Sequence, residues 1–174
     1  MPKIIENIKE LLLAEAKKQI SEQGYSATTI RSVASACGVG VGTVYNYFES
    51  KELLIATFVL ESWKKHLDMM NSLVDDEPKE LLQGVYDLLR QFEEENKKLF
   101  SDSEATKIIS MSFSSRHKML RSQIANIIKP MCEKKQLDDP SFTADFISEA
   151  LINWSMEEVD FEMIYPLLDK IIRK

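Results

Sequence analysis

Histidine and cysteine are scarce in this chain, with two of each among 174 residues. Cys37 and Cys132 lie outside any spacing typical of a metal site, and a reducing compartment would keep both as thiols. The sequence also lacks paired carboxylates in a glycine-rich setting, a nucleophile elbow and a phosphate-binding loop. These absences favour a protein that is not an enzyme and needs no metal or cofactor. We expect both thiols to be buried.

Long hydrophobic runs are also missing. The longest apolar run, Leu53–Leu60, is interrupted by Thr57 and falls far short of the ~18 residues that a membrane span requires. The N-terminal sequence MPKIIENIKE turns polar within a few residues, unlike a secretory signal. We therefore expect a cytoplasmic protein without a membrane partner, folded as one domain or two small ones.

Period-two alternation, the signature of strands, is absent, and every long segment has helical periodicity instead. The apolar residues from Ile4 to Ile20 predict a first helix that stops at Gly24. Pro140 follows a clear break, and the segments after it predict two further helices. The fold class we expect is all-α, with a three-helix N-terminal part, a long connecting helix and a helical body.

The boundaries of several helices follow from their punctuation. We expect Ser50 to cap a helix from about Lys51 to Val74, because no glycine or proline interrupts that stretch. Pro78 opens the next helical pattern, which fades in the charged run 93–98, and 101–107 predicts a short helix or turn. Pro130 should kink or end the helix expected within 108–136. Pro166 leaves the start of the last helix open.

Glycine is rare but clustered, since four of the five glycines lie between Gly24 and Gly42. Thr29 is placed to cap a short helix, and the sequence around Gly38 predicts the turn that follows it. In the next helix Val44 and Phe48 form an inward stripe, which leaves the tyrosines beside them facing outward. This pattern predicts a helix-turn-helix of the kind that enters the DNA major groove.

The net charge of −6 is unevenly distributed. Residues 1–52 carry six basic and six acidic groups, so the whole excess of acid lies in residues 53–174. An acidic protein is a weak candidate for DNA binding, because contacts to phosphate dominate non-specific affinity. The predicted helix-turn-helix region is neutral, however, so the overall charge does not exclude it.

Between Ile4 and Ala56 the sequence resembles the tetracycline-repressor (TetR) family of bacterial transcription regulators. The shared motifs are GY at 24–25, TTI at 28–30, VA at 33–34, CGV at 37–39, GTVY at 42–45, YF at 47–48 and SKEL at 50–53. Gly40 stands where the family usually has a serine. The resemblance implies a homodimer that binds a palindromic operator on double-stranded DNA and is released by a small-molecule effector. It divides the chain into a DNA-binding domain, 1–50, and a ligand-binding and dimerisation domain, 51–174.

The residues carried over for DNA binding lie on the outward side of this region. They are Thr29, Arg31, Val41, Gly42, Thr43, Tyr45, Asn46, Tyr47 and Lys51. Tyrosine hydroxyls and Arg31 suit phosphate contacts, and Asn46 has the groups for a bidentate bond to adenine. The resemblance pairs Lys51 with a phosphate, which agrees with its place at a helix N-terminus. Each of these side chains is alternatively an ordinary core or surface residue.

The body offers weaker signals. Residues that we consider for an effector pocket are Trp63, His66, Tyr86, Phe92, Phe113 and His117, and the alternative is that they form core. Residues that we consider for a dimer interface are Phe142, Phe146, Trp154, Phe161 and Ile164, and the alternative is that they close the monomer's own core. A second class of function also stays open, a helical interaction protein regulated by a protein partner.

Overall fold

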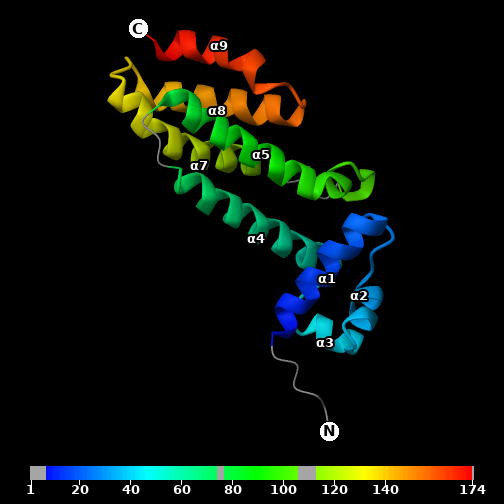
Figure 1. The fold of residues 1–174 in the computed structure, drawn as a ribbon. Helices are drawn as coiled ribbons and strands as arrows, with labels where there is room; N and C mark the ends of the chain where they lie inside the picture. Colours follow the sequence, from blue (N-terminus) through cyan, green and yellow to red (C-terminus); the bar gives the residue numbers. More distant parts are fainter. Residues whose placement is uncertain (1–6, 74–76, 106–112, 174) are drawn as a thin grey trace. The chain divides into compact units, whose positions relative to one another are not determined.

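The computed structural model describes residues 7–73, 77–105 and 113–173, and within these ranges every regular element is a helix (Figure 1). The predicted all-α class is confirmed. The helices are α1 (Ile8–Gln23), α2 (Ile30–Ala36), α3 (Val41–Tyr45), α4 (Lys51–Asn71), α5 (Pro78–Phe100), α7 (Phe113–Lys134), α8 (Pro140–Met156) and α9 (Phe161–Ile172). Ile4, Val74 and residues 106–112 of the predicted segments lie outside the described ranges.

The chain packs as two compact units. The first consists of Met1–Ser62 with Glu95–Met111, and the second of Trp63–Glu94 with Ser112–Lys174. Helices α4 and α5 therefore each contribute residues to both units. The first unit contains the whole predicted helix-turn-helix together with the last turns of α5.

The predicted helix ends are confirmed where capping residues mark them. Gly24 ends α1 with φ 87°, a conformation that side chains with a Cβ rarely adopt. The Thr29 hydroxyl accepts a hydrogen bond from the Ser32 amide at 3.0 Å and begins α2. Ser50 and Asp139 cap α4 and α8 in the same way, accepting from the amides three residues ahead.

Helix α5 continues through the charged run in which its apolar pattern fades. The reason is a change of partner, because Phe92 packs against the core of the second unit and Leu99 is buried in the first. Charged residues between them bond to α1, with Lys17 Nζ 2.9 Å from Glu95 and Lys98 Nζ donating to the Glu22 carbonyl at 3.1 Å. The apolar residues of α5 therefore do not follow one periodicity along the whole helix, although the helix itself continues.

Neither internal proline ends its helix. Pro130 lies within α7 and Pro166 within α9, and both side chains are exposed. An exposed ring avoids crowding the core, although each proline still removes one backbone hydrogen bond from its helix.

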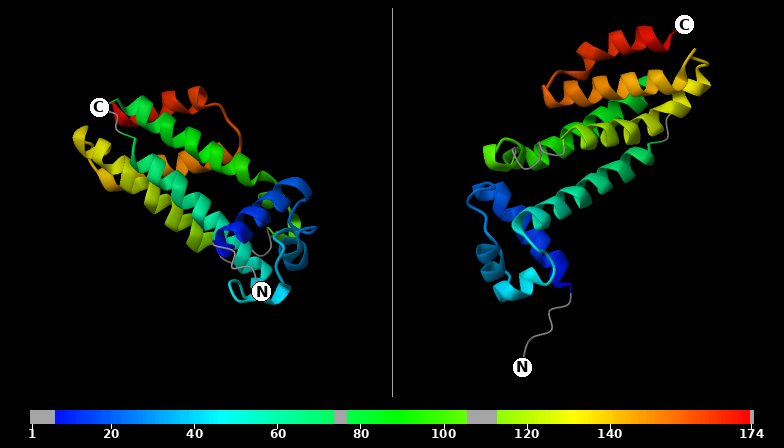
Figure 2. Two further views of the ribbon diagram at one scale, coloured as in Figure 1. Left: turned by 60° about the horizontal axis from the view of Figure 1, so that its bottom comes forward. Right: turned by 180° about the vertical axis from the view of Figure 1, so that it is seen from behind.

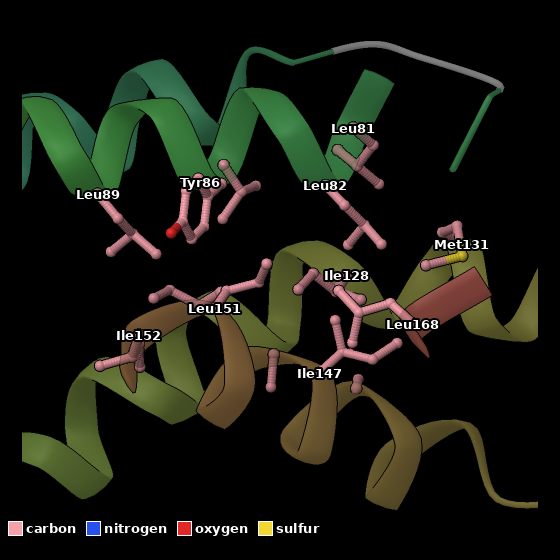
Figure 3. Packing of buried hydrophobic residues seen from close by; sticks show 14 of the residues in the cluster. Leu81, Leu82, Tyr86, Leu89, Ile128, Met131, Ile147, Leu151, Ile152 and Leu168 are labelled. Atoms are coloured by element: carbon pink, nitrogen blue, oxygen red, sulfur yellow. The ribbon is translucent and has the colours of Figure 1, made fainter. Parts of the chain in front are cut away.

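The core of the second unit is built by α5, α7, α8 and α9 together with the part of α4 that begins at Trp63. In Figure 2, α7 and α8 run side by side with α9 next to α8. Figure 3 shows leucines of α5, such as Leu82 and Leu89, directed toward Ile128 of α7 and Leu151 of α8. The first unit has its own core, in which Leu12, Val33 and Phe48 are buried.

Among the described residues, none of the helices combines the length and the hydropathy that a membrane-spanning helix needs. The expectation for the two thiols is met only in part. Cys132 is fully buried, whereas Cys37 is half-buried with its Sγ 3.7 Å from the Leu11 carbonyl oxygen. Cys37 lies at the C-terminal end of the short helix α2.

Candidate nucleic-acid interface

One face of helix α3 packs against the core of the first unit. Val44 and Phe48, the predicted inward pair, have no more than 2% of their surface exposed. The helix begins after Gly40, whose backbone is extended and which supplies no capping side chain. Gly38, at φ 68°, turns the chain between α2 and α3. This turn sets the direction of the five-residue helix α3 relative to α2.

The opposite face of α3 carries the residues that the sequence selects for DNA. Tyr45 and Tyr47 have 52% and 48% of their surface exposed, so neither ring belongs to the core. Gly42 and Asn46 are also exposed, as is Val41, while Thr43 is half-buried. Arg31 is exposed on α2. The structure therefore gathers phenol, amide, guanidinium and methyl groups on α2, α3 and the turn after it.

The side chain of Thr29 caps the N-terminus of α2. Its hydroxyl accepts from the Ser32 amide, and the Ser32 hydroxyl accepts in turn from the Thr29 amide at 3.0 Å. Ser32 Oγ also lies 2.6 Å from the Oε1 of Gln19 on α1. This polar network was not foreseen from the sequence, although the Thr-Thr-Ile-Arg-Ser spacing predicts the cap itself.

Lys51 lies in an environment that the sequence does not reveal. Its Nζ donates to the Tyr25 carbonyl oxygen at 2.6 Å and lies 3.7 Å from the centre of the Tyr25 ring. Burial lowers the pKa of Lys51, while the charges of Glu52, Glu104 and Asp102 act in the opposite direction. The ammonium is therefore half-buried and already bonded.

Tyr25 is the partner that sequence reasoning missed. It is buried, and its hydroxyl donates to Glu52 Oε1 at 3.2 Å. Burial, together with the negative charge of Glu52, raises the pKa of Tyr25 to about 12. The only signal in the sequence is the Gly-Tyr pair directly after α1, because nothing local connects it to Lys51.

The turn after α1 is also bonded to the residues that follow α5. The Ser26 hydroxyl lies 3.2 Å from Asp102 Oδ2 and 3.1 Å from Glu104 Oε2, and its amide donates to Asp102. These bonds lie at the surface, where each contributes modestly to stability. They anchor one edge of the helix-turn-helix within its own unit.

Among the residues considered for an effector, the structure brings three together. The rings of Trp63 and His66 each meet the Phe92 ring edge to face, with centroids 5.2 and 5.4 Å away. Trp63 Nε1 donates to Gln123 Oε1 at 2.9 Å. Trp63 and His66 are buried and Phe92 is half-buried, so the cluster joins α4, α5 and α7 within the second unit.

The remaining effector candidates have other surroundings. The buried Tyr86 hydroxyl donates to the carbonyl groups of Trp154 and Val159, and thereby holds the turn between α8 and α9. His117 Nε2 lies 2.8 Å from Glu149 Oε1 on α8. The side chain of Phe113 lies outside the described residues. In the described part of the chain no group of three potential ligands is arranged for a metal ion.

The residues considered for a dimer interface divide into two sets. Phe142, Phe146 and Trp154 are exposed on α8. Phe161 and Ile164 are buried in the core of their own unit, which corrects their assignment to a surface, because the turn into α9 directs them toward α5 and α8. Helix α9 exposes a different apolar row, made of Met163, Leu167 and Ile171.

This chain is similar to known proteins in part of its sequence and in its fold. Residues 12–57 match the family model for bacterial regulatory proteins of the tetR family. Two uncharacterized HTH-type transcriptional regulators of Bacillus subtilis are similar in sequence, YhgD with 41% identity over 63 residues and YerO with 32% identity over 78 residues. These matches cover 34% and 42% of this chain and 33% and 27% of the relatives, so the chain spans at most about a third of their length.

The likeness in fold extends further than the likeness in sequence. A solved structure of the fatty acid degradation regulator FadR from Bacillus halodurans superposes with a TM-score of 0.60. It is 20% identical, and the match covers 98% of this chain and 96% of that one. At this identity the comparison establishes the fold alone.

Proposed function

We propose, from the membership of this chain in the tetR family of bacterial regulatory proteins, that it is a DNA-binding transcriptional repressor that acts as a homodimer. The observation that carries the proposal is the division of α3 into two faces. Val44 is buried with the core, while Tyr45 and Tyr47 project outward with about half of their surface exposed. Large aromatic side chains left exposed beside a buried anchor suit a partner surface.

The exposed groups suit the parts of a DNA duplex. We propose that the hydroxyls of Tyr45 and Tyr47 and the guanidinium of Arg31 contact phosphates, which position the protein without reading sequence. Asn46 reads a base edge, and the methyl groups of Val41 and Thr43 meet thymine methyls. Gly42 lets the backbone approach closely, and Thr29 keeps α2 in place through its cap.

A palindromic operator requires a symmetric dimer, and α8 and α9 offer the surface for it. Both helices belong to the second unit and each exposes a row of large apolar side chains. The rows are Phe142, Phe146 and Trp154 on α8, with Met163, Leu167 and Ile171 on α9. We propose that two copies pair these rows in a four-helix interface, which hides apolar surface that a monomer would leave in water.

For the effector we propose a small apolar or amphipathic molecule that binds among Trp63, His66 and Phe92. The cluster is mostly apolar and has polar groups at His66 and Gln123, the composition typical of ligand sites. Fatty acyl compounds are the first class to test, because an acyl chain suits the mostly apolar surroundings of this cluster. Binding in this cluster would release the DNA.

The DNA-binding part is tested by selecting duplexes from a random pool with the purified protein and measuring affinity by fluorescence anisotropy. Asn46→Ala should lose about 1–3 kcal/mol of discrimination at one base pair and keep its affinity for mismatched duplexes. Tyr47→Phe should weaken binding on all duplexes alike. Lys18→Ala, on the exposed side of α1, is the matched control and should change neither quantity. Failure to select any common sequence would refute the proposal.

The effector part uses the two tryptophans of the chain. In a Trp154→Phe variant, Trp63 is the sole indole fluorophore, and its emission should change when a fatty acyl compound binds. A Phe92→Leu variant should bind the same compound more weakly, since it removes the aromatic ring that meets Trp63 and His66 in the proposed site. Cationic compounds serve as the comparison class. Fluorescence and thermal stability that respond to neither class would point to a different trigger.

A further inference from the structure

The bond between Lys51 and Tyr25 joins the two ends of the segment that holds the helix-turn-helix. Tyr25 directly precedes the turn into α2, and Lys51 is the first residue of α4. Helices α2 and α3 lie between them, and 26 positions separate the bonded residues. A contact between Lys51 and Tyr25 therefore holds the two ends of this segment close together.

The Tyr25 carbonyl is a shared acceptor. It receives the Lys51 ammonium at 2.6 Å and the Thr28 amide at 3.2 Å. The Thr28 hydroxyl in turn donates to the Gly24 carbonyl at 2.9 Å, and the next residue, Thr29, caps α2. Lys51 is thus connected through two backbone groups to the place where α2 begins.

The ammonium is also enclosed from another side. The Tyr25 ring lies 3.7 Å away, close enough for a cation–π contact, and the side chain is half-buried. Tyr25 itself is fixed by its hydrogen bond to Glu52. A lysine that turned away from this position to reach a phosphate would give up a charge-assisted hydrogen bond and a ring contact.

We propose that Lys51 is a positioning residue, which acts on DNA through Tyr25 by clamping the ends of the helix-turn-helix segment, and is not itself a phosphate ligand. The inference rests on the proposed DNA-binding function and replaces the phosphate contact that the family resemblance implies for Lys51. The clamp holds the start of α2 against the start of α4, so that α3 is presented to the duplex in one orientation.

The experiment compares Lys51→Met, Lys51→Arg and Lys18→Met in the full chain. Methionine keeps the unbranched apolar part of the side chain and removes the charge and the donors, whereas arginine keeps the charge and the donors. Lys18 is exposed on α1 and supplies the matched loss of one charge from the same unit. Thermal midpoints are measured without DNA, and affinities are measured well below those midpoints over a range of salt concentrations on one selected duplex.

If Lys51 is a clamp, Lys51→Met lowers the thermal midpoint by about 2–4 °C. It weakens binding of the folded protein about tenfold, and the slope of log affinity against log salt stays at the wild-type value. Lys51→Arg restores affinity to within about threefold of wild type, because its guanidinium also donates and stacks on aromatic rings. Lys18→Met leaves the midpoint and the affinity unchanged.

Two results would overturn the clamp. A salt slope reduced by about one unit, with an unchanged midpoint, would make Lys51 a phosphate ligand. A lowered midpoint with wild-type affinity would make its role structural only. Arg31→Met separates this inference from the proposed function, since a phosphate contact there predicts a slope lower by about one. If wild-type protein binds no duplex, the proposed function and the positioning role both fail, whatever the midpoints show.

Discussion

Replacing Phe146 by alanine tests the proposed dimer through a single exposed side chain. Phe146 has 51% of its surface exposed on α8. An aromatic side chain can bury about 200 Å², so about 100 Å² is available to a partner. At about 25 cal/mol per Å² this contributes about 2.5 kcal/mol from each copy. In a symmetric interface the residue is present twice, which gives about 5 kcal/mol for full burial and about 2.5 kcal/mol for half burial.

The expected result is a dissociation constant raised about 10²–10⁴-fold. Sedimentation velocity over a concentration series measures it, because the monomer has a mass of 20.0 kDa. Leu60→Ala is the matched control. Leu60 is an apolar residue with 57% of its surface exposed, but it lies on α4 within the first unit. Its replacement should leave the dissociation constant unchanged.

Either of two results would contradict the proposed dimer. Wild-type protein that sediments as a 20.0 kDa species at micromolar concentration would remove the dimer itself. If Phe146→Ala does not weaken the dimer, the exposed apolar row of α8 does not belong to the interface. Circular dichroism of the variant should match wild type, since an exposed ring contributes little to the folding of its own chain.

Three further results are expected. Gly38→Ala should destabilise the protein by about 1 kcal/mol in urea unfolding because its φ is positive, whereas Gly42→Ala, in a helix with open space at the Cβ position, should be neutral or slightly stabilising. Tyr45→Phe should weaken DNA binding severalfold in anisotropy titrations and leave the thermal midpoint unchanged, because about half of the surface of Tyr45 is exposed. Burial raises the pKa of Glu149, but its hydrogen bonds from His117 and other neighbours outweigh this and hold the pKa below the ordinary 4.5. A depressed pKa stabilises the fold above about pH 4.5, and this stabilisation is lost as the pH falls through the folded-state value. The thermal midpoint of Glu149→Gln should therefore lie below that of wild type at pH 7, and the difference should shrink toward about pH 3.

Features that depend on neighbours along the chain are predictable from the sequence. The cap at Thr29, the stop at Gly24 and the inward pair Val44 and Phe48 were all predicted and are confirmed. Each depends on residues within one or two helical turns. The exposure of the tyrosines followed, because a five-residue helix with one face buried must turn its other residues outward.

Features for which one sequence pattern has two physical meanings are not predictable in this way. Phe142 and Phe161 both mark an apolar helix face, yet one is exposed and the other is buried. The fading of the apolar pattern after Phe92 indicated the end of a helix, but α5 continues into a second core. Periodicity shows that a face is apolar and does not show what covers it.

Helical character, helix punctuation and the outward face of α3 were thus encoded locally, since backbone propensity, capping and periodicity act over a few residues. Tertiary packing determined which residues that lie far apart in the sequence are in contact. Lys51 rests on Tyr25 across the whole helix-turn-helix, and the buried aromatic cluster unites residues from α4 and α5. Such contacts form only when separate helices are brought together, because their free energy comes from burial and alignment that no short stretch of chain can supply.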